Sequence, residues 1–465
     1  MHGKFRRKPQ GRIDLVIPFF VTLALLTILS FCIFLRPTRS MLEKRELAEF
    51  PQFTWEALAS GDYFDDISLW FSDTFPGREG WIDLATRISS LHGTSNITIS
   101  GDLPMMEEIP EVPETTAAAE ITEAAEETVP AEEEAGEAVT EAVTEAAAEA
   151  PTEAGWGGVD VEHAEEIQLG AVIQIGDTAF NSQGFSEGQS KKYARILNTL
   201  QENVKSQGIR VVSAPAPTSV GIMVEKKYLQ KMHCADQEEI LNYMHSQLSE
   251  DVVAVDTFNA LLPHNNEYIY FRTDHHWTAL GAYYSYRAIC EALEYEPADL
   301  DRFEVWEQGE FKGSLTYQCA RPRKLKPDYV DAYIPEGEIT HKVYSKMGIP
   351  TERPLLQDMR EREVNTKYLT FIWSDNPLSE IVNESLPDGP TCILVKDSFG
   401  NALAPFLTQN YHRVLVVDYR KFNLMRLDDM AVKYKVDDII FTPYITATQS
   451  IQGNQMMGSL CKVYN

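Results

Sequence analysis

The chain from residue 157 to 465 is predicted to form an α/β domain with a parallel sheet. Apolar segments at 167–175 and 208–215 have the composition of buried strands, and the amphipathic stretch 190–207 lies between them. Strands that alternate with helices in this way are typical of βαβ units. Further strands are predicted at 252–256, 391–397, 413–420 and 437–442, and further helices near 237–248, 402–410 and 425–434.

Residues from about 300 to 365 interrupt this alternation. They mix strand-like pieces, turns and charged residues, as in the stretch from Gly309 to Tyr317. The segment is predicted to be an insertion or lid on the α/β domain.

The negative charge of the chain is concentrated in one segment. The formal net charge is −29, and residues 107–156 contain 16 Asp or Glu and no Lys or Arg. Residues 101–156 consist largely of Glu, Ala, Thr and Pro, so like charges repel and there is little apolar surface to offset ordering entropy. This segment is therefore predicted to be a disordered acidic spacer. No basic stripe interleaved with aromatic residues points to a nucleic-acid partner.

Residues 13–35 are predicted to be a transmembrane anchor. Asp14 is the only charged residue among these 23, and a helix rising about 1.5 Å per residue crosses a hydrocarbon core of about 30 Å. The basic tail 1–12 predicts a cytoplasmic N-terminus and a C-terminal part outside the membrane. A cleavable signal peptide is the alternative, but the apolar stretch is long for one and no small-residue cleavage site follows it.

Residues 36–100 are predicted to be a juxtamembrane helical packing segment. Aromatic and apolar residues from Tyr63 to Phe71 recur at helical spacing, and Phe75-Pro76-Gly77-Arg78 ends the pattern with a turn. The segment is expected to lie between the membrane and the main domain.

The cysteines predict neither a metal site nor a complete disulfide framework. Cys32 lies in the apolar N-terminal run, and the other five are far apart and lack Cys/His metal spacing: Cys234, Cys290, Cys319, Cys392 and Cys461. Structural zinc needs closely spaced ligand pairs. We therefore expect isolated buried thiols, no metal and no diffusible cofactor.

Two adjacent histidines follow an aspartate in Asp274-His275-His276-Trp277. The block lies between an aromatic, strand-like run and a predicted helix that Thr278 can cap. In an extended or turn conformation, positions i and i+2 project to one side, so Asp274 can orient His276 while His275 points elsewhere. A Ser-His-Asp triad, structural histidines and a metal site are the alternatives, although a metal would need further ligands and the other histidines are scattered.

Ser398 is the candidate nucleophile. The buried strand 391–397 runs into it just before a predicted helix, whose first N–H groups can hold an oxyanion. A serine at such a turn is more often a helix N-cap. The combination with Asp274 and His276 favours the catalytic interpretation.

These residues belong to a larger set of motifs that resembles the bacterial DHHW-motif protein family. The set comprises Asp274 to Trp277, the upstream Glu43 to Pro51 and Phe75 to Arg78, Gly313-Ser314-Leu315, Val395 to Phe399, Pro405-Phe406-Leu407 and Val417 to Arg420. That family is similar to the SGNH-hydrolase-like alginate O-acetyltransferase group, in which an Asp-x-His motif precedes the Ser nucleophile and reverses the usual hydrolase order.

The resemblance implies an SGNH-hydrolase-like, flavodoxin-like parallel sheet with helices on both faces. It also implies acyl transfer to or from envelope polysaccharide, with Ser398 as nucleophile, His276 as base and Asp274 as its orienter. Gly313, Asn401, Tyr419 and Arg420 are the candidates for oxyanion or substrate contacts.

The function expected on this basis is that of a membrane-anchored O-acetyltransferase that works outside the cytoplasm. A membrane-embedded protein would supply its acyl groups and a cell-envelope polysaccharide would accept them. A carbohydrate acetylesterase would use the same residues with water as acceptor. A non-catalytic envelope or polysaccharide-binding protein on the same fold is the alternative from another class.

Overall fold

The computed structural model describes residues 157–162, 164, 167–319 and 322–461, together with scattered positions between 36 and 112. The chain divides into two compact units, residues 1–93 and 94–465. The predicted basic tail, transmembrane anchor and nearly all of the acidic spacer lie outside the described residues, as does most of the packing segment 36–100. Among the residues that are described, no helix is both long enough and apolar enough to cross a membrane.

An eight-stranded mixed sheet forms the centre of the second unit. Its order is β10 (Pro350–Glu352), β9 (Ile339–Tyr344), β11 (Leu378–Asn383), β13 (Arg413–Asp418), β12 (Thr391–Lys396), β14 (Asp438–Thr442), β5 (Arg210–Ser213) and β6 (Val253–Ala254). The five strands from β13 to β6 are parallel, as predicted. The prediction of a wholly parallel sheet is wrong, because β11, β9 and β10 extend it with antiparallel pairs.

The parallel strands have the flavodoxin-like order in a circularly permuted chain. Counted from β12, the order β13-β12-β14-β5-β6 reads 2-1-3-4-5, which is the flavodoxin order. Along the chain, however, the five strands come in the order β5, β6, β12, β13, β14. The strand β12, which is first in the flavodoxin numbering, is therefore the third of them in the sequence.

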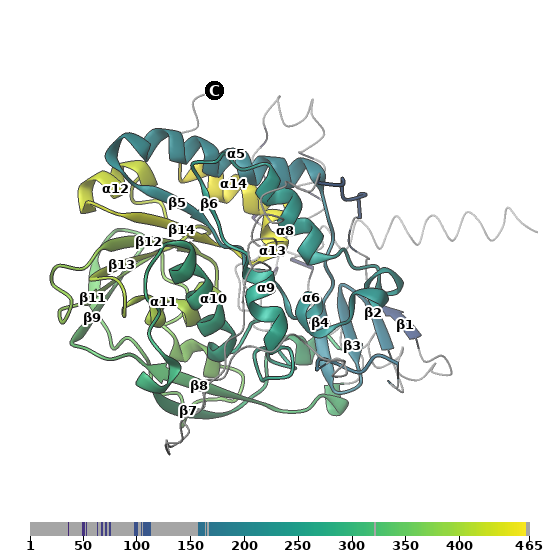
Figure 1. The fold of residues 1–465 in the computed structure, drawn as a ribbon. Coiled ribbons are helices and arrows are strands. Elements are labelled where there is room, and N and C mark those ends of the chain that lie inside the picture. The colour runs from purple at the N-terminus through teal and green to yellow at the C-terminus, as the bar shows by residue number, and fades with distance from the viewer. Residues whose placement is uncertain are drawn as a thin grey trace, which may run out of the picture. The chain divides into compact units, whose positions relative to one another are not determined.

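Helices lie on both sides of the central sheet (Figure 1). One layer contains α5 (Glu187–Val204), α12 (Leu427–Tyr434) and α14 (Ile451–Ser459), and the opposite layer contains α10 (Ala279–Ala292) and α11 (Gly400–Leu407). The shorter helices are α6 (Ser219–Met223), α7 (Lys226–Leu229), α8 (Gln237–Ser246), α9 (Thr257–Leu261) and α13 (Ile445–Thr448). The strands β12, β13 and β14 are almost wholly buried, as their apolar runs predict.

Two smaller sheets account for errors in the predicted strand pattern. The segment 167–175, predicted as one strand of the parallel sheet, forms the antiparallel pair β2 (Ile167–Gly170) and β3 (Val172–Ile175) of a separate sheet with β1 (Ile97–Ser100) and β4 (Thr178–Asn181). Gly170 has φ of 148°, and the hairpin reverses directly after it. The apolar residues on both sides of this turn made two short strands look like one continuous strand in the sequence.

The segment from about 300 to 365 does not form one detached lid. It begins with the antiparallel pair β7 (Glu304–Phe311) and β8 (Asp328–Ile334), whereas β9 and β10 join the edge of the central sheet.

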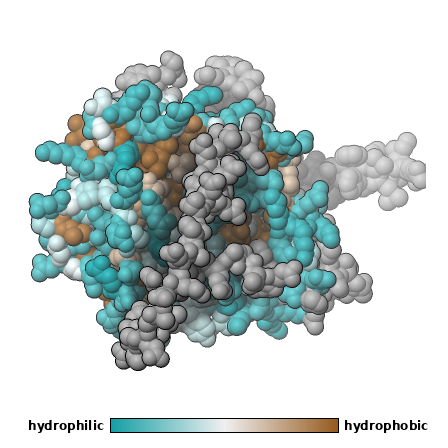
Figure 2. Space-filling model, in the orientation of Figure 1, coloured by the Kyte–Doolittle hydropathy of each residue, from teal (hydrophilic) through white to brown (hydrophobic). Residues whose placement is uncertain are grey.

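On the face shown in Figure 2, hydrophobic residues form small patches separated by hydrophilic ones.

Replacing Gly281 with Ala is expected to destabilise the domain by about 1–3 kcal/mol, as overpacking does. A Cβ atom there would lie 2.4 Å from the carbonyl oxygen of Ile269 and 3.1 Å from the Cβ of Trp277. Gly188→Ala is the matched control, because Gly188 is also helical and nothing lies within 4 Å of its added Cβ. Urea unfolding of both variants tests the packing of α10, and an unchanged midpoint for Gly281→Ala would contradict it.

Candidate active site

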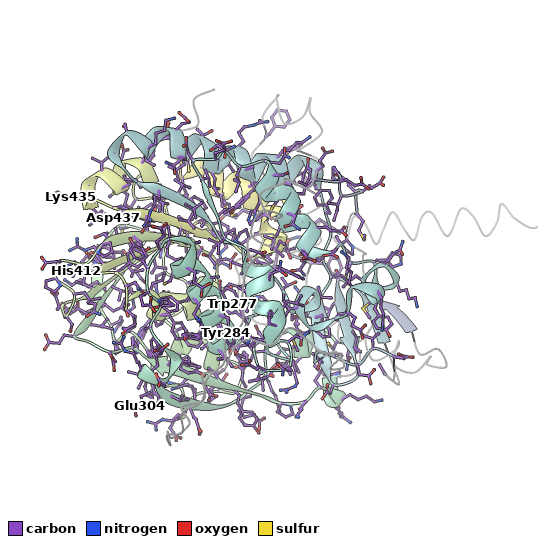
Figure 3. All side chains as sticks on the ribbon, in the orientation of Figure 1. Trp277, Tyr284, Glu304, His412, Lys435 and Asp437 are labelled. Carbon is purple, nitrogen blue, oxygen red and sulfur yellow. The ribbon has the colours of Figure 1, made fainter. Side chains whose placement is uncertain are left out.

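The block Asp274 to Trp277 lies on a tight turn between an isolated bridge and α10. Tyr270 and Trp277 pair across the turn, and the Thr278 hydroxyl accepts a hydrogen bond of 3.3 Å from the Gly281 N–H. The predicted N-cap at Thr278 is therefore confirmed. Trp277 is fully buried (Figure 3), and its indole N–H donates to the carbonyl of Phe399 at 3.0 Å, which joins this turn to the segment that carries Ser398.

A buried carboxylate on β8 holds the start of this turn. Asp328 accepts hydrogen bonds from the Tyr268 hydroxyl at 2.7 Å and the Arg272 N–H at 2.9 Å with one oxygen. Its other oxygen accepts from the Thr273 N–H at 2.7 Å and the Thr273 hydroxyl at 2.5 Å. The Thr273 hydroxyl in turn accepts from the Gly313 N–H at 2.9 Å. Burial raises the pKa of Asp328, although these hydrogen bonds oppose the shift.

Asp274 is positioned to orient the His276 ring. Its Oδ1 lies 2.5 Å from Nδ1 of His276 and accepts from the His276 N–H at 3.1 Å. Its Oδ2 accepts from the Ser314 N–H at 2.8 Å. Burial alone would raise the pKa of Asp274, but electrostatic interaction with the His275 and His276 side chains and the hydrogen bonds from His276 and Ser314 lower it below its ordinary value. The carboxylate is thus ionised and fixes the proton of His276 on Nδ1.

The other ring nitrogen of His276 faces Ser398. The distance between Nε2 and the Ser398 Oγ is 2.7 Å. The ring stacks on Tyr368, with centroids 4.1 Å apart and planes at 12°, and the Tyr368 hydroxyl donates to the Ser398 carbonyl at 2.9 Å. His276 is buried and Ser398 is partly exposed. The row Asp274, His276 and Ser398 therefore ends at a hydroxyl that solvent can reach.

Ser398 lies at the point where the strand order of the sheet reverses. It follows β12, and Tyr444 follows the neighbouring strand β14, at the carboxyl edge where α/β sheets bind ligands. Asp397 bridges the two strand ends, because one of its oxygens accepts from the Tyr444 N–H at 2.8 Å and the Tyr419 hydroxyl at 3.0 Å. Its other oxygen accepts from the Phe399 N–H at 3.0 Å.

Ser398 is not the N-cap of the helix that follows. The capping position of α11 is Phe399, with helical φ and ψ and no side-chain cap. The Ser398 hydroxyl is left for His276, and its backbone N–H has no hydrogen-bond partner in the described part of the chain. That N–H is a candidate oxyanion donor which the sequence analysis did not identify.

The four residues predicted to contact substrate or oxyanion are occupied in other ways. The Gly313 N–H is donated to Thr273, and a Cβ at Gly313 would lie 2.2 Å from the Cβ of Asp274, so this glycine allows the chain to approach closely. The Asn401 side chain is buried between Lys396 at 2.6 Å and Asp375 at 3.0 Å. The Gly313 N–H is therefore already used, and the Asn401 amide is held inside a buried network.

Tyr419 and Arg420 belong to the supporting structure of the same edge. Tyr419 donates to Asp397, as described above. Arg420 donates to Asp418 at 2.7 and 2.9 Å and to Asp375 at 2.9 Å. Its side chain is 31% exposed, but two carboxylates balance its charge. An acidic substrate would have to compete with them.

Lys396, two residues before Ser398, belongs to a charge network with Asp375, Asp418 and Arg420. The Lys396 ammonium donates to Asp375 at 3.2 Å, to Asp418 at 3.3 Å and to Asn401. Burial alone would raise the pKa of Asp375, but Lys396 and Arg420 lower it. Buried charges of opposite sign thus hold the ends of β12 and β13 together.

The loop that supplies Asp375 has an unusual backbone. Ile372, Trp373 and Ser374 all have positive φ, at 43°, 59° and 71°, which is rare for residues other than glycine. The Asn376 amide donates to all three of their carbonyls at 3.1 to 3.3 Å. Hydrogen bonds thus retain a strained turn beside the site.

His275 packs against the His276 ring and the segment that carries Ser314. Its Nδ1 lies 3.1 Å from the Ser314 hydroxyl, and its ring is 3.9 Å from that of His276. Burial lowers the pKa of His275 to about 4, as does the charge of His276, while Asp274 opposes the shift. His275 is therefore neutral at physiological pH.

Asp274, His275 and His276 are also the one group of at least three Asp, Glu, His or Cys side chains, among the described residues, whose atoms could hold a metal ion. Nδ1 of His276 is already bonded to Asp274 and Nδ1 of His275 to Ser314. A metal would have to displace Ser398 from the remaining His276 nitrogen. These side chains are therefore better suited to the hydrogen bonds that link Asp274, His276 and Ser398 than to binding a metal ion.

Sequence reasoning missed the groups that support the row. Asp328 and Tyr368 act on the Asp274 turn and on Ser398 from segments remote in sequence, whereas Asp375 and Lys396 hold the ends of β12 and β13 beside Ser398. Lys396 carried the clearest signal, because a lysine inside a buried apolar strand requires a partner of opposite charge. The others occur in segments with no periodic pattern to mark them.

Comparisons with known proteins were made for both sequence and structure. The family described as DHHW protein matches residues 43–417. A DHHW family protein from Eubacterium siraeum aligns at 26% identity with a TM-score of 0.57, covering 63% of this chain and 96% of that one. PatB1 from Bacillus cereus, in a structure with a sulfonyl adduct, aligns at 15% identity with a TM-score of 0.53, covering 63% and 98%.

The O-acetyltransferase domain of Pseudomonas putida AlgJ aligns at 15% identity with a TM-score of 0.35, covering 61% of this chain and 96% of that domain. No protein with curated annotation matches the sequence.

Replacing Asp328 with Asn is expected to destabilise the domain by at least about 2 kcal/mol, because an amide NH₂ would face donors that now share a carboxylate oxygen. Asp331→Asn on the same strand is the control, since its carboxylate makes no hydrogen bond to a described residue. Urea unfolding measures both. Equal midpoints for the two variants would show that Asp328 does not hold the turn.

Proposed function

Because this chain belongs to the DHHW protein family, we propose that it is an acyl-transfer enzyme in which Ser398 is the nucleophile, His276 the general base and Asp274 the residue that orients the base. The observation that carries the proposal is the continuous row of 2.5 and 2.7 Å contacts from Asp274 through His276 to a partly exposed Ser398. A non-catalytic protein has no need of a serine placed within hydrogen-bond reach of an oriented imidazole.

The first half of the reaction forms an acyl-enzyme. His276 Nε2 takes the proton of the Ser398 hydroxyl as Oγ attacks the carbonyl carbon of an acyl donor. The Ser398 N–H is free to donate to the resulting oxyanion. Collapse of the tetrahedral intermediate expels the donor's leaving group, to which His276 returns the proton, and the acyl group stays on Ser398.

The second half transfers the acyl group to an acceptor hydroxyl. His276 removes the proton of that hydroxyl, its oxygen attacks the Ser398 ester, and the proton returns to Oγ as the serine is released. We propose a sugar hydroxyl of a cell-envelope polysaccharide as acceptor and acetyl as the acyl group, as the resemblance of the sequence motifs implies. With water as acceptor the same residues would make a carbohydrate acetylesterase.

The predicted N-terminal anchor would place this domain outside the cytoplasm, with a membrane-embedded protein as the source of acyl groups. The acidic spacer would then provide reach between the membrane and the polymer.

Ser398→Ala and His276→Ala are each expected to lower kcat by at least about a thousand-fold, since members of a triad act as a unit. The assay uses the full chain with a chromogenic acetyl ester, with and without an oligosaccharide acceptor. Acceptor-dependent acetyl sugar would support a transferase, and unchanged ester hydrolysis in its presence an esterase. His412→Ala is the histidine control, because the one hydrogen bond of the His412 ring to a described residue is with the Asn383 carbonyl, outside the row.

Covalent labelling provides a test that does not depend on the substrate. Phenylmethanesulfonyl fluoride is expected to add one sulfonyl group to wild type, mapped to Ser398 by peptide mass spectrometry, and none to Ser398→Ala. Full activity in both Ser398→Ala and His276→Ala, or labelling only at another residue, would rule out the assignment.

His275→Gln is expected to leave the shape of the pH–rate profile unchanged between about pH 5 and 8. The pKa of His275 is lowered to about 4, so its ring stays neutral throughout this range and cannot produce the acid limb. The measurement is kcat/KM against pH for wild type and variant. An acid limb that moves or disappears in His275→Gln would assign the titrating base to His275 instead of His276.

A further inference from the structure

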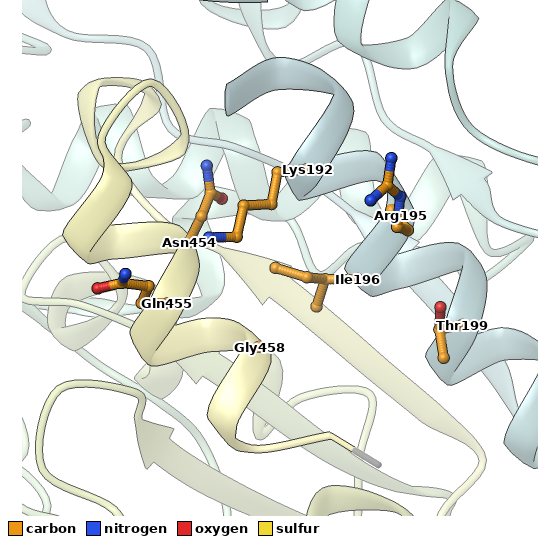
Figure 4. Close-up of a pocket in the computed structure, with 7 residues that line it drawn as sticks. All are labelled: Lys192, Arg195, Ile196, Thr199, Asn454, Gln455 and Gly458. Carbon is orange, nitrogen blue, oxygen red and sulfur yellow. The ribbon is translucent and has the colours of Figure 1, made fainter. Parts of the chain in front are cut away.

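A groove of about 270 Å³ lies between α5 and α14 (Figure 4). Its lining residues are Lys192, Arg195, Ile196 and Thr199 from α5, and Asn454, Gln455 and Gly458 from α14. None of them takes part in the candidate active site. The volume suits a group about the size of one sugar unit, since pockets for drug-sized ligands start near about 300 Å³.

Asn454 is one of the residues that line the groove, and its side-chain oxygen is a buried, unsatisfied acceptor. Its amide nitrogen donates to the Thr448 carbonyl at 2.8 Å and to the backbone and side-chain oxygens of Gln189 at 3.0 and 3.1 Å. Three acceptors around one amide end identify that end as the nitrogen, so the other end is Oδ1. Asn454 is fully buried, and its Oδ1 has no hydrogen-bond partner among the described residues. In Figure 4 the amide lies beside Lys192, at the groove. A ligand that donates a hydrogen bond would satisfy it.

Two positive charges beside this acceptor are also uncompensated. Neither Lys192 nor Arg195 makes an ion pair or hydrogen bond with another described residue, and no acidic residue lines the groove. By contrast, Lys191 pairs with Glu187 at 2.6 Å and Lys205 with Glu202 at 2.7 Å at the two ends of the same helix. In a chain with a net charge of −29, a groove lined by two cations that no described residue pairs with, and by no acid, marks a place for an anion.

We propose that the groove between α5 and α14 binds a hydroxylated anion, namely a sugar or polyol unit that carries a carboxylate or phosphate. The anionic group would lie between Lys192 and Arg195, and a ligand hydroxyl would donate to Oδ1 of Asn454. Such a unit is the repeat of an acidic polymer, so the groove would hold the polymer without acting on it. The proposal does not depend on the role of Ser398.

Isothermal titration calorimetry of the full chain tests the groove with tetragalacturonate and with a glycerol phosphate oligomer. At least one of these probes is expected to bind, and which one binds distinguishes a carboxylate from a phosphate ligand. The double variant Lys192→Gln, Arg195→Gln should weaken that binding by at least about tenfold, since two charge-assisted contacts are lost. Cellotetraose, which is neutral, should bind at least about tenfold more weakly than the anionic probe, for the same reason.

Three further variants separate the groove from general attraction to basic residues. Lys191→Gln with Lys205→Gln removes the same charge outside the groove and should leave binding unchanged, as should Ser398→Ala. Gly458→Leu should abolish binding without a change of charge, because a Cβ at Gly458 already lies 3.4 Å from the Cδ1 of Ile196 and a larger side chain fills the groove. Thermal melting checks that each variant is folded.

Absence of binding by both anionic probes would overturn the proposal. Equal weakening in the Lys191→Gln, Lys205→Gln control would show that attraction is not local to the groove and would also overturn it. So would equally tight binding of polyglutamate, an anion without hydroxyl groups, since the Asn454 contact would then contribute nothing.

Discussion

The buried carboxylate of Asp328 is the constraint on which the candidate active site depends. It accepts four hydrogen bonds from three residues of the segment that leads into the Asp274 turn, and so ties that turn to β8. Burying a carboxylate costs free energy unless both of its oxygens accept hydrogen bonds. We therefore expect the four hydrogen bonds to Asp328 to form together or not at all. The Gly313 N–H donates to the Thr273 hydroxyl, and the Ser314 N–H donates to Asp274. Asp274 in turn holds the His276 ring in contact with Ser398.

The order of the strands explains why the acid and base precede the nucleophile in the chain. Ser398 follows the first strand of the flavodoxin order, at the switch point between β12 and β14. Because the chain enters the sheet at the fourth strand of that order, the turn with Asp274 and His276 comes earlier in sequence yet meets the same edge. Starting the chain at a different strand changes the order of the motifs in the sequence but keeps their positions at the edge of the sheet.

Periodicity and local spacing predicted much of this molecule. The apolar runs of β12, β13 and β14, the helix capped by Thr278, and the pairing of Asp274 with His276 all depend on neighbours in sequence. Reasoning of that kind failed at β2 and β3, where a turn divides one alternating run, and at β9 to β11, where antiparallel strands extend a parallel sheet. The contact of Gly313 with Thr273, and those of Asn401 and Arg420 with Asp375, were also beyond its reach, because these partners lie in distant segments.

The sequence by itself determined the α/β class, though not the antiparallel extension of the sheet, and it determined the residues of the candidate triad and the approach of Asp274 to His276, since positions two apart on a turn share a side. Only the tertiary structure decided that the His276 ring meets Ser398 across 122 positions of chain, and that Ser398 is left free instead of capping α11. It also decided that, among the described residues, Asn454 keeps an unpaired buried oxygen where two cations without ion-pair partners line a groove. The physical reason is that local propensity acts over a few residues, whereas hydrogen bonds and charge balance at a site are set by strands and helices that pack from all parts of the chain.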